Sequence, residues 1–360
     1  MARFHPLPVV EIRRETAECV SIALAVPEEL KPAFRFRPGQ HLVVRAVVDG
    51  AEVRRTYSLC STPREDTLRI AVKRQPHGRF SGFANARLAV GDRLEAMPPT
   101  GRFAHTPDPG ARRHYVAFAA GSGITPIFGI LKAILEEEPH SRFTLFYGNR
   151  NTSSIIFREG LADLKDLYME RLALHHVLSA EVSEALELFS GRIDAEKVRA
   201  WAGRLFQVSE VDRWFVCGPA PMIQTVSDAL LALGVPAERI LFEYFTAEGN
   251  RPRPVLETAP RIETSGDRAR ITVILDGERH EFDMPFRAET VLEAARRFGL
   301  ELPFSCRAGV CATCRARLVA GKVELLTNYA LDERDLAAGD VLTCQARPLT
   351  AEVTLDFDRA

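Results

Sequence analysis

Four cysteines toward the C-terminal end of the chain have a spacing that suits redox chemistry. Cys306, Cys311 and Cys314 stand in FSCRAGVCATC as C-x4-C-x2-C, and Cys344 follows in LTCQAR. This spacing is typical of a plant-type 2Fe-2S cluster, whose irons are bound by cysteine thiolates. Gly309 lacks a Cβ and lets backbone amides turn toward the sulfurs. We therefore expect these thiolates to bind a 2Fe-2S cluster that passes single electrons to another protein.

A structural zinc ion is the alternative occupant, because four thiolates also satisfy tetrahedral zinc. Zinc ribbons usually pair two C-x2-C knuckles, whereas this chain has one. Four unligated core cysteines are a further alternative. Three arginines, Arg307, Arg315 and Arg317, flank the cysteines. They are either a solvated face or a basic rim for an acidic patch on an electron acceptor.

A second candidate site is the R-T-Y-S sequence formed by Arg55, Thr56, Tyr57 and Ser58 on a predicted strand. Side chains alternate along a strand, so Arg55 and Tyr57 share one face. An arginine can neutralise a pyrophosphate, a tyrosine can lie against a flat ring, and a serine can donate to a ring nitrogen. The pattern indicates a flavin site, although any one of these residues alone is more often plain barrel surface.

The stretch LRIAVKRQPHGRFSGFANARL supports the flavin site from a second direction. It runs from a predicted strand through a glycine turn into a predicted helix. Free amides at a helix start bind anions and suit the flavin diphosphate, although every helix needs an N-cap and we expect Ser81 to provide it. The candidate residues of this stretch are Val72, Lys73, Gly78, Arg79, Phe80 and Ser81.

Two further glycine-containing turns predict a dinucleotide site. AAGSGITPIFGIL follows a predicted strand and opens a helix, and VCGPAPM ends a later strand. Glycines let backbone amides approach a pyrophosphate at the carboxyl edge of a parallel sheet. A buried strand cysteine is the alternative for Cys217, which lacks a basic partner that would make it a nucleophile. The candidate residues are Gly121, Ser122, Gly123, Thr125, Pro126, Cys217, Gly218, Pro219 and Met222.

The ribose end of the dinucleotide is predicted from RFTLFYGNRNTSSIIFRE. An acidic residue after the second strand holds a ribose 2′-hydroxyl, whereas arginine accommodates a 2′-phosphate. This strand end has no acid and offers Arg150, Ser153, Ser154 and Arg158. We therefore expect NADPH to be favoured over NADH.

The whole chain has the composition of a multidomain globular protein. It has 360 residues, 46% of them hydrophobic, and a net charge of −1, which gives no reason to expect nucleic acid. No apolar stretch is long enough to predict a membrane span. The seven cysteines do not resemble a secreted disulfide framework, so we expect a cytoplasmic protein.

The elements that position these motifs fall into three parts. Residues 1–108 show short alternating segments (HLVVRAV, VRRTYSL, TLRIAVK, DRLEAMP), which predict an antiparallel β-barrel. Residues 111–246 alternate buried apolar runs with amphipathic helices and predict an α/β domain with a parallel sheet. Proline-rich residues 249–267 predict a linker. Residues 268–360 form the third part, which opens with a hairpin around Asp276 and Gly277.

With these motifs the chain resembles the ferredoxin-NADP reductase superfamily, in the form that carries a C-terminal plant-type ferredoxin domain. The resemblance extends over all three parts and is closest to the reductase subunits of phenylacetyl-CoA epoxidases. RTYSLCS, YGNRNTSSIIFREGL, CGPAPM and SCRAGVCATC carry it. It implies an FAD-binding barrel, an NAD(P)-binding α/β domain and a β-grasp 2Fe-2S ferredoxin domain. Phe304 and Ala312 depart from the usual residues of the ferredoxin loop without removing a ligand.

The resemblance also implies a function. Tyr57, Ser58, Glu243 and Phe245 would lie at the reaction centre, the last two as a carboxylate and an aromatic ring near the flavin. Electrons would pass from NADPH to FAD, to the 2Fe-2S cluster and to a di-iron oxygenase component in phenylacetate catabolism. The alternatives are a reductase of another oxygenase, such as a ring-hydroxylating dioxygenase or a steroid hydroxylase, and a non-catalytic redox-sensing or zinc-binding protein.

Overall fold

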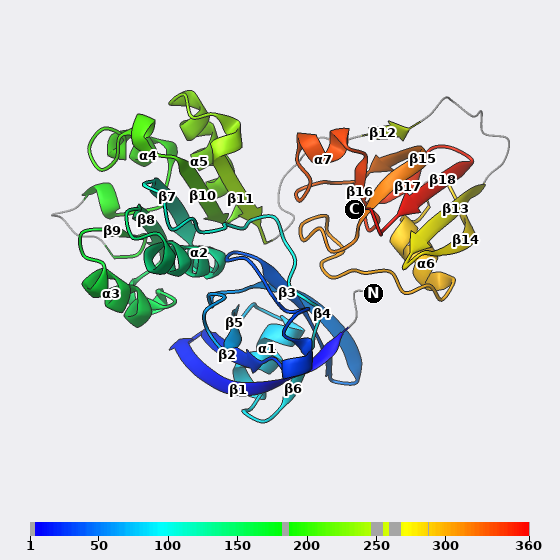
Figure 1. Cartoon of the computed structure of the whole chain (residues 1–360), viewed down its shortest axis with the longest axis horizontal. Helices are drawn as coiled ribbons and strands as arrows, with labels where there is room; N and C mark the ends of the chain where they lie inside the picture. The colour runs from blue at the N-terminus through cyan, green and yellow to red at the C-terminus, as the bar shows by residue number, and fades with distance from the viewer. Residues whose placement is uncertain (1–3, 182–186, 246–254, 259–267, 287, 360) are drawn as a thin grey trace. The chain divides into compact units, whose positions relative to one another are not determined.

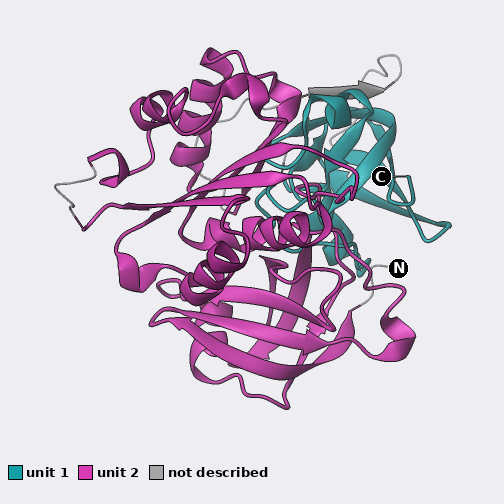
Figure 2. Cartoon of the chain, turned by 60° about the vertical axis from the view of Figure 1, so that its left-hand side comes forward, with its two compact units in different colours: residues 1–3, 246–360 teal, residues 4–245 magenta. Residues whose placement is uncertain are grey.

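The computed structural model describes residues 4–181, 187–245, 255–258, 268–286 and 288–359. The chain forms two compact units (Figure 2), one of residues 4–245 and one that contains the described residues from 255 onward. Among the described residues, no helix is both long and apolar enough to cross a membrane.

The first part of unit 4–245 is a six-stranded antiparallel sheet in the order β4-β3-β6-β1-β2-β5. An isolated bridge between Leu59 and Ile70 joins its two edge strands and closes it as a barrel. Two of the six strands, β1 and β2, were not among the segments that the sequence pattern indicated. The elements are β1 (His5–Thr16), β2 (Cys19–Ala25), η1 (Glu28–Leu30), β3 (His41–Val48), β4 (Ala51–Ser58), β5 (Thr67–Lys73), α1 (Arg79–Ala86) and β6 (Arg93–Ala96).

The second part of the same unit is a five-stranded parallel sheet in the order β11-β10-β7-β8-β9. Its inner strands read as apolar runs because helices cover both faces of the sheet (Figure 1). Helices α2 and α3 pack on one face, and Trp201 of α4 stacks on Phe118 and Phe146 on the other. The strands are β7 (His114–Ala120), β8 (Arg142–Asn149), β9 (Leu172–Leu178), β10 (Arg213–Gly218) and β11 (Ile240–Tyr244). The helices are η2 (Gly121–Gly123), α2 (Ile124–Glu137), η3 (Thr152–Ser154), α3 (Arg158–Leu167), η4 (Glu187–Phe189), α4 (Ala195–Trp201), η5 (Val208–Glu210), α5 (Ala220–Ala232) and η6 (Ala237–Arg239).

This strand order places β7 between β8 and β10, so the chain winds in opposite directions on either side of β7. Ligands of open parallel sheets bind at such a reversal, beyond the carboxyl ends of the two strands that flank it. At that edge, Gly121–Gly123 follows β7, and β10 ends at Gly218, with Pro219 next.

The second unit contains a mixed sheet in the order β12-β15-β18-β13-β14, with β16 and β17 also paired to β15. The predicted hairpin is confirmed, because Asp276 and Gly277 connect β13 and β14 with φ of 55° and 76°. The parallel pairing of β13 with β18, covered by α6, gives the β-grasp arrangement that the resemblance implied. The elements are β12 (Val255–Thr258), β13 (Arg268–Leu275), β14 (Glu278–Pro285), α6 (Val291–Arg297), β15 (Arg315–Leu325), α7 (Glu333–Ala337), β16 (Asp340–Leu342), β17 (Ala346–Pro348) and β18 (Glu352–Asp356).

Most of the predicted linker, residues 249–267, lies outside the described residues. Its four described residues form β12, which pairs antiparallel with β15. The predicted fold class of barrel, parallel α/β domain and β-grasp domain is confirmed.

Candidate functional site

A half-buried carboxylate lies where the barrel meets the parallel sheet. Ser58, the last residue of β4, donates a hydrogen bond of 3.1 Å from Oγ to Oε2 of Glu243 on β11. His41, the first residue of β3, brings Nδ1 to 3.6 Å from the other oxygen, Oε1. Cys217 lies beside Glu243 in the β10–β11 register. Ser58 and Glu243 are therefore in contact. The family resemblance had placed both at the reaction centre.

The two glycine turns at the carboxyl edge of the sheet are packed directly on each other. A Cβ on Gly123 would lie 2.2 Å from the carbonyl oxygen of Cys217, so only glycine fits there without moving the backbone. A Cβ on Gly218 would lie 2.7 Å from the methyl carbon of Met222. The two turns thus meet at the strand reversal, the place where a dinucleotide pyrophosphate binds in open parallel sheets.

Side chains from neighbouring elements hold the first of these turns. The hydroxyl of Thr125 donates to the carbonyl of Ser122 at 2.8 Å, and Pro126 lies in the first turn of α2. Tyr147 on β8 donates to the carbonyl of Gly121 at 2.9 Å. The Nζ atom of Lys73, which belongs to the barrel, lies 4.0 Å from the position of a Cβ on Gly121. Lys73 was a sequence candidate, whereas Tyr147 was missed because it reads as an ordinary strand aromatic.

The R-T-Y-S strand and helix α1 meet through their aromatic rings. The rings of Tyr57 and Phe80 have centroids 5.4 Å apart, and burial raises the pKa of Tyr57. Arg55 is exposed and donates to the neighbouring carbonyl of Arg54, while Thr56 is half-buried. The R-T-Y-S strand and α1 are therefore in contact through these two rings.

The expected cap of α1 was wrong in one detail. Gly78 is the N-cap, and Ser81 lies inside the first turn, where its hydroxyl donates to the Gly78 carbonyl and accepts from the amide of Gln75. The side chain of Arg79 donates to the carbonyl of Val48, away from the helix start, and Val72 fills the barrel core. The helix amides are thus left without a side-chain acceptor, which is the condition for an anion site.

An acid from a later part of the chain contacts the loop after β8. Glu181, from beyond the end of β9, accepts from the amide and hydroxyl of Thr152 at 2.8 Å and 2.7 Å. The hydroxyl of Thr152 and, more weakly, the charge of Arg158 lower the pKa of Glu181. Ser153 and Ser154 bond to Asn151 within the loop, and Arg150 is exposed. The strand end itself has no acid, as the sequence predicts, but the segment that follows β9 brings one to the loop.

Cys217 and Phe245 differ in their surroundings. Cys217 is fully buried, and desolvation raises the pKa of its thiol well above the ordinary value, with the charge of Glu243 adding to the effect. A thiol of this kind is a poor nucleophile. Phe245 follows β11 and is 40% exposed. Pro219 is the N-cap of α5.

In the second unit, the four late cysteines lie as two hydrogen-bonded pairs. The Cys311 thiol donates to the Cys306 sulfur, which lowers the pKa of Cys306 to about 6 and raises that of Cys311 well above its ordinary value. The Cys314 thiol donates to Cys344 and lowers its pKa in the same way. Across the described ranges, no three His, Cys, Asp or Glu side chains are grouped as they would be around a single metal ion.

The backbone of the cysteine loop fits a cluster of thiolates. The amides of Ala308 and Val310 point at the Cys306 sulfur, at 3.4 Å and 3.5 Å. Three residues of the loop, Arg307, Gly309 and Ala312, have φ between 54° and 72°, which turns successive amides to the inside. Thr313 and Gln345 donate to the sulfurs of Cys311 and Cys344. Donors aimed at sulfur stabilise the thiolate form that an iron–sulfur cluster needs.

The three arginines near this loop do not form a free basic rim. Arg307 pairs with Glu293 at 3.0 Å. Arg315 lies 3.8 Å from Asp335 and 3.6 Å from Asp340, and Arg317 lies 2.8 Å from Asp340. Their charges are compensated within the domain, so the basic-rim hypothesis loses its structural basis.

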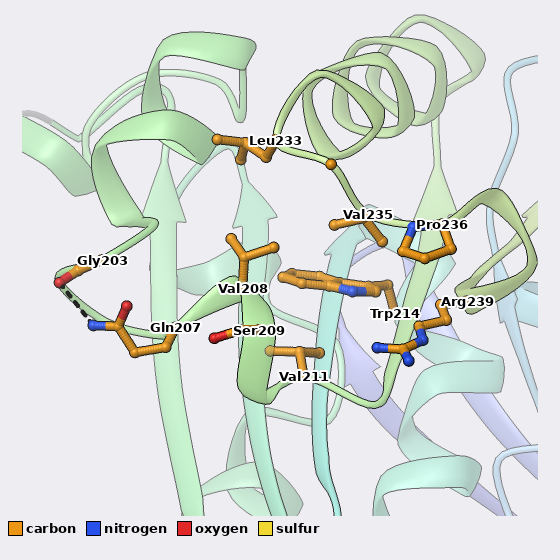
Figure 3. A pocket seen from close by; sticks show the side chains of 11 residues that line it. Gly203, Gln207, Val208, Ser209, Val211, Trp214, Leu233, Val235, Pro236 and Arg239 are labelled. Atoms are coloured by element: carbon orange, nitrogen blue, oxygen red, sulfur yellow. Dashed lines mark hydrogen bonds between the residues drawn. The ribbon is translucent and has the colours of Figure 1, made fainter.

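A cavity of about 530 Å³ opens at the other edge of the parallel sheet (Figure 3). Trp214, near the start of β10, lies among Val235, Pro236 and Arg239, which precede β11. These are the amino ends of the strands, opposite the glycine turns. None of the sequence candidates lines this cavity.

Comparison with known protein families divides the chain into three matched segments. Residues 6–105 match the oxidoreductase FAD-binding domain, and residues 118–228 match the oxidoreductase NAD-binding domain. Residues 273–349 match the 2Fe-2S iron-sulfur cluster binding domain. The chain therefore contains domains for FAD, a pyridine nucleotide and a 2Fe-2S cluster.

Two relatives are similar over nearly the whole chain. One subunit of 1,2-phenylacetyl-CoA epoxidase from Escherichia coli (strain K12) is 43% identical over 358 residues, which cover 99% of both chains. The ferredoxin reductase component of 3-ketosteroid-9-alpha-monooxygenase from Rhodococcus rhodochrous is 36% identical over 357 residues, with 98% of this chain and 96% of the relative covered.

Two solved structures share the fold. Phthalate dioxygenase reductase has a TM-score of 0.59 and 23% identity, with 98% of each chain covered. An intact type IV self-sufficient cytochrome P450 monooxygenase has a TM-score of 0.67 and 23% identity; the match covers 98% of this chain and 41% of that protein. This chain thus spans about two fifths of the longer protein.

Proposed function

The chain belongs to the ferredoxin-NADP reductase superfamily, among the reductase components of oxygenases that carry a C-terminal 2Fe-2S domain, and we propose that it delivers electrons from NADPH to a di-iron oxygenase, phenylacetyl-CoA epoxidase. The observation that carries this proposal is the 43% identity, over essentially the full length, to one of the subunits of that enzyme. The clustered cysteines, without a secreted disulfide pattern, support a cytoplasmic location.

The residues at the barrel–sheet junction would bind and orient the two nucleotides. The exposed guanidinium of Arg55 and the free amides after Gly78 suit the flavin diphosphate, with Tyr57 beside the ring system. The turns that contain Gly123 and Gly218 suit the pyrophosphate of the pyridine nucleotide. FAD held by these residues would supply a flavin ring that can take a hydride from the nicotinamide and release electrons singly.

The Ser58 hydroxyl and the Glu243 carboxylate would hold or transfer a proton at this site. Both side chains are largely shielded from water: Ser58 is 4% exposed, and the Glu243 side chain is 14% exposed. A hydroxyl that donates to a fixed carboxylate can hold or relay a proton beside the flavin ring. Cys217, whose burial raises its thiol pKa, takes no nucleophilic part.

The preference for NADPH rests on the exposed Arg150, Arg158 and Ser153 of the loop after β8. Glu181 does not act as a ribose-binding acid in this proposal, because both of its oxygens already accept from Thr152. Steady-state KM values for the two nucleotides test this directly. A KM for NADH equal to or below that for NADPH would reverse the assignment.

The experiment for the acceptor is reconstitution. The purified holoprotein is mixed with the oxygenase subunits of phenylacetyl-CoA epoxidase, NADPH and phenylacetyl-CoA, and formation of the epoxide is measured against NADPH consumed. Coupled turnover is expected. NADPH oxidation with ferricyanide, but none with these subunits, would keep the reductase and reject this acceptor.

A steroid hydroxylase is the second candidate acceptor, because the ketosteroid monooxygenase reductase component is 36% identical over nearly the whole chain. The same assay with its oxygenase component distinguishes the two. A non-catalytic or zinc-binding protein would instead lack the visible absorption of flavin and iron–sulfur centres, and NADPH would not bleach it.

A further inference from the structure

We propose that His41 is a positioning residue that holds the Glu243 carboxylate beside the Ser58 hydroxyl, with Thr100 fixing the orientation and the tautomer of the His41 ring. This inference rests on the proposed function and adds two residues, His41 and Thr100, that the sequence motifs did not indicate. All of the residues involved belong to the compact unit of residues 4–245.

The first observation is a matched pair of side chains on either side of the carboxylate. His41 and Ser58 are directly opposite each other in the antiparallel β3–β4 pair, so their side chains emerge on the same face of the sheet. Ser58 Oγ lies 3.1 Å from Oε2 of Glu243, and His41 Nδ1 lies 3.6 Å from Oε1. Each oxygen of the carboxylate is thereby faced by one barrel side chain.

The second observation is that the ring of His41 is fixed from behind. The backbones of His41 and Thr100 exchange hydrogen bonds of 2.8 Å and 3.0 Å. The Thr100 hydroxyl also lies 3.3 Å from Nε2 of the ring. When this hydroxyl donates to Nε2, the ring proton is on Nδ1, the nitrogen that faces Glu243. The arrangement is the one in which a second partner sets the tautomer of a functional histidine.

The third observation is that Gly101 leaves room for the His41 ring. Gly101 has a φ of 123°, a region that other residues avoid, and a Cβ there would lie 2.9 Å from Nδ1 of His41. His41 itself is 3% exposed. The Glu243 side chain is 14% exposed, and this exposed part of the carboxylate is accessible to a bound ligand.

The consequence follows from the cost of a buried charge. A carboxylate that loses one of its polar partners in a buried site turns toward water or toward the remaining donor. Without His41, Glu243 keeps Ser58 and loses its second partner from the barrel. The orientation of the carboxylate relative to the Ser58 hydroxyl is then no longer fixed. A misplaced catalytic group costs about 10- to 100-fold in rate without a matching loss of nucleotide binding.

The test uses the FAD-loaded, full-length protein and three variants at the site. His41→Phe removes the ring nitrogens, His41→Asn keeps an amide donor near Nδ1, and Glu243→Gln removes the charge. We expect His41→Phe to slow flavin reduction by NADPH at least tenfold with an unchanged KM, and His41→Asn to stay within about threefold of the wild type. The double variant His41→Phe/Glu243→Gln should be no slower than Glu243→Gln alone.

A matched control is available in the same unit. His114 is also buried, and its Nε2 also bonds to a threonine, Thr144, at 2.9 Å, but it lies at the amino end of β7. His114→Phe should leave the rate of flavin reduction unchanged. Thermal unfolding of the FAD-loaded protein gives a readout independent of activity. The losses of unfolding free energy from His41→Phe and Glu243→Gln should be less than additive, and those from His114→Phe and Glu243→Gln additive.

The outcomes separate this inference from the proposed function. A wild-type protein whose flavin is not reduced by NADPH contradicts the proposed function itself. A functional wild type with His41→Phe at full rate, with His41→Asn and His41→Phe equally slow, or with additive effects in the double variant overturns the role of His41. If His41→Phe does not fold, Thr100→Val takes its place: a slowed reduction with unchanged KM supports the role, and a full rate overturns it.

Discussion

The two candidate sites of this protein are built in different ways. The cysteine loop takes three of its four sulfurs from nine consecutive residues, 306–314, and the loop's own amides point at them. The junction of barrel and parallel sheet takes its groups from segments far apart, such as Ser58 and Glu243, and holds them with buried polar contacts. A local site depends on its own backbone, whereas a distributed site depends on the contacts that join its parts.

The junction has a second buried polar pair on its other side. The carboxylate of Glu138, at the end of α2, is fully buried and accepts from the amide of Asp108 and the hydroxyl of Tyr115. His105 Nε2 lies 2.8 Å from its Oε1, and the His105 amide donates to the carbonyl of Pro38 in the barrel. His–Glu contacts thus join the two halves of this unit at two places.

The largest effect is expected from the loss of one cluster ligand, which should impair the cysteine loop and leave the barrel–sheet junction functional. Cys311→Ser should reduce electron delivery to the oxygenase by about 100-fold or more, because serine does not replace the thiolate. Flavin reduction by NADPH and ferricyanide activity should stay at wild-type rates. Cys60→Ser is the matched control, since Cys60 is a buried cysteine outside the loop that donates to the carbonyl of Arg69. Loss of flavin reduction in Cys311→Ser would mean that the two sites are not separable.

Acid should weaken the junction through Glu138. Despite its burial, hydrogen bonds from His105, Ser141, Asp108 and Tyr115 lower the pKa of Glu138 from 4.5 to about 2. A lowered pKa gives stability that is fully present above pH 4.5 and is lost as the pH falls toward 2, about 3 kcal/mol in all.

The measurement is the free energy of unfolding between pH 5 and pH 2. Glu138→Gln should flatten its decline in this range. The control is Glu136→Gln, two positions earlier on α2, because burial raises the pKa of Glu136 and gives a dependence of opposite sign. An equal decline in the wild type and Glu138→Gln would show that Glu138 does not hold the junction.

Close packing of the glycine turns gives the next effect. Gly123→Ala places a Cβ 2.2 Å from the Cys217 carbonyl, which should cost about 1–3 kcal/mol of unfolding free energy and weaken NADPH binding. Gly82→Ala is the control, because nothing lies within 4 Å of its Cβ position in α1 and alanine is the better helix former. Calorimetry and nucleotide titration measure both. A fully stable Gly123→Ala protein with normal NADPH affinity would contradict the close approach of the two turns.

The smallest effect tests the backbone of the cysteine loop. Ala312 has a φ of 54°, which costs a residue with a Cβ roughly 1–2 kcal/mol relative to glycine. Ala312→Gly should therefore stabilise the domain by about 1 kcal/mol, seen as slower cluster loss in denaturant. Ala308→Gly, at a residue of the same loop without a positive φ, should not stabilise it. Equal behaviour of the two variants would remove the strain argument.

The difference between the sites also explains what the sequence alone predicts. Spacing was enough to predict a 2Fe-2S domain, which residues 273–349 match, and Asp276–Gly277 was enough to predict the hairpin, because local backbone chemistry decides both. Ser58 and Glu243 lie 185 positions apart, and only the family resemblance placed both at the reaction centre; their contact was not predicted. His41 and Thr100 carry no motif, since a histidine that starts a strand reads as an ordinary barrel residue.

The errors have the same origin. The acid at the β8 loop was missed because Glu181 comes from the segment after β9. The basic rim stayed open as an alternative because the sequence does not show that Asp335 and Asp340 lie beside the arginines of the cysteine loop. Ser81 was expected to cap α1 because glycine gives no side-chain signal, although Gly78 is the N-cap. Tertiary contacts decide each of these points.

The most direct test of the central claim is an anaerobic titration of the FAD-loaded protein with NADPH, followed by visible absorption and electron spin resonance. The account predicts that NADPH bleaches the flavin and that the spin signal of a reduced 2Fe-2S cluster then appears, and that Cys311→Ser keeps the bleaching and loses the signal. A flavin that is bleached in the wild-type protein while the cluster remains oxidised would contradict an electron path from the junction to the cysteine loop.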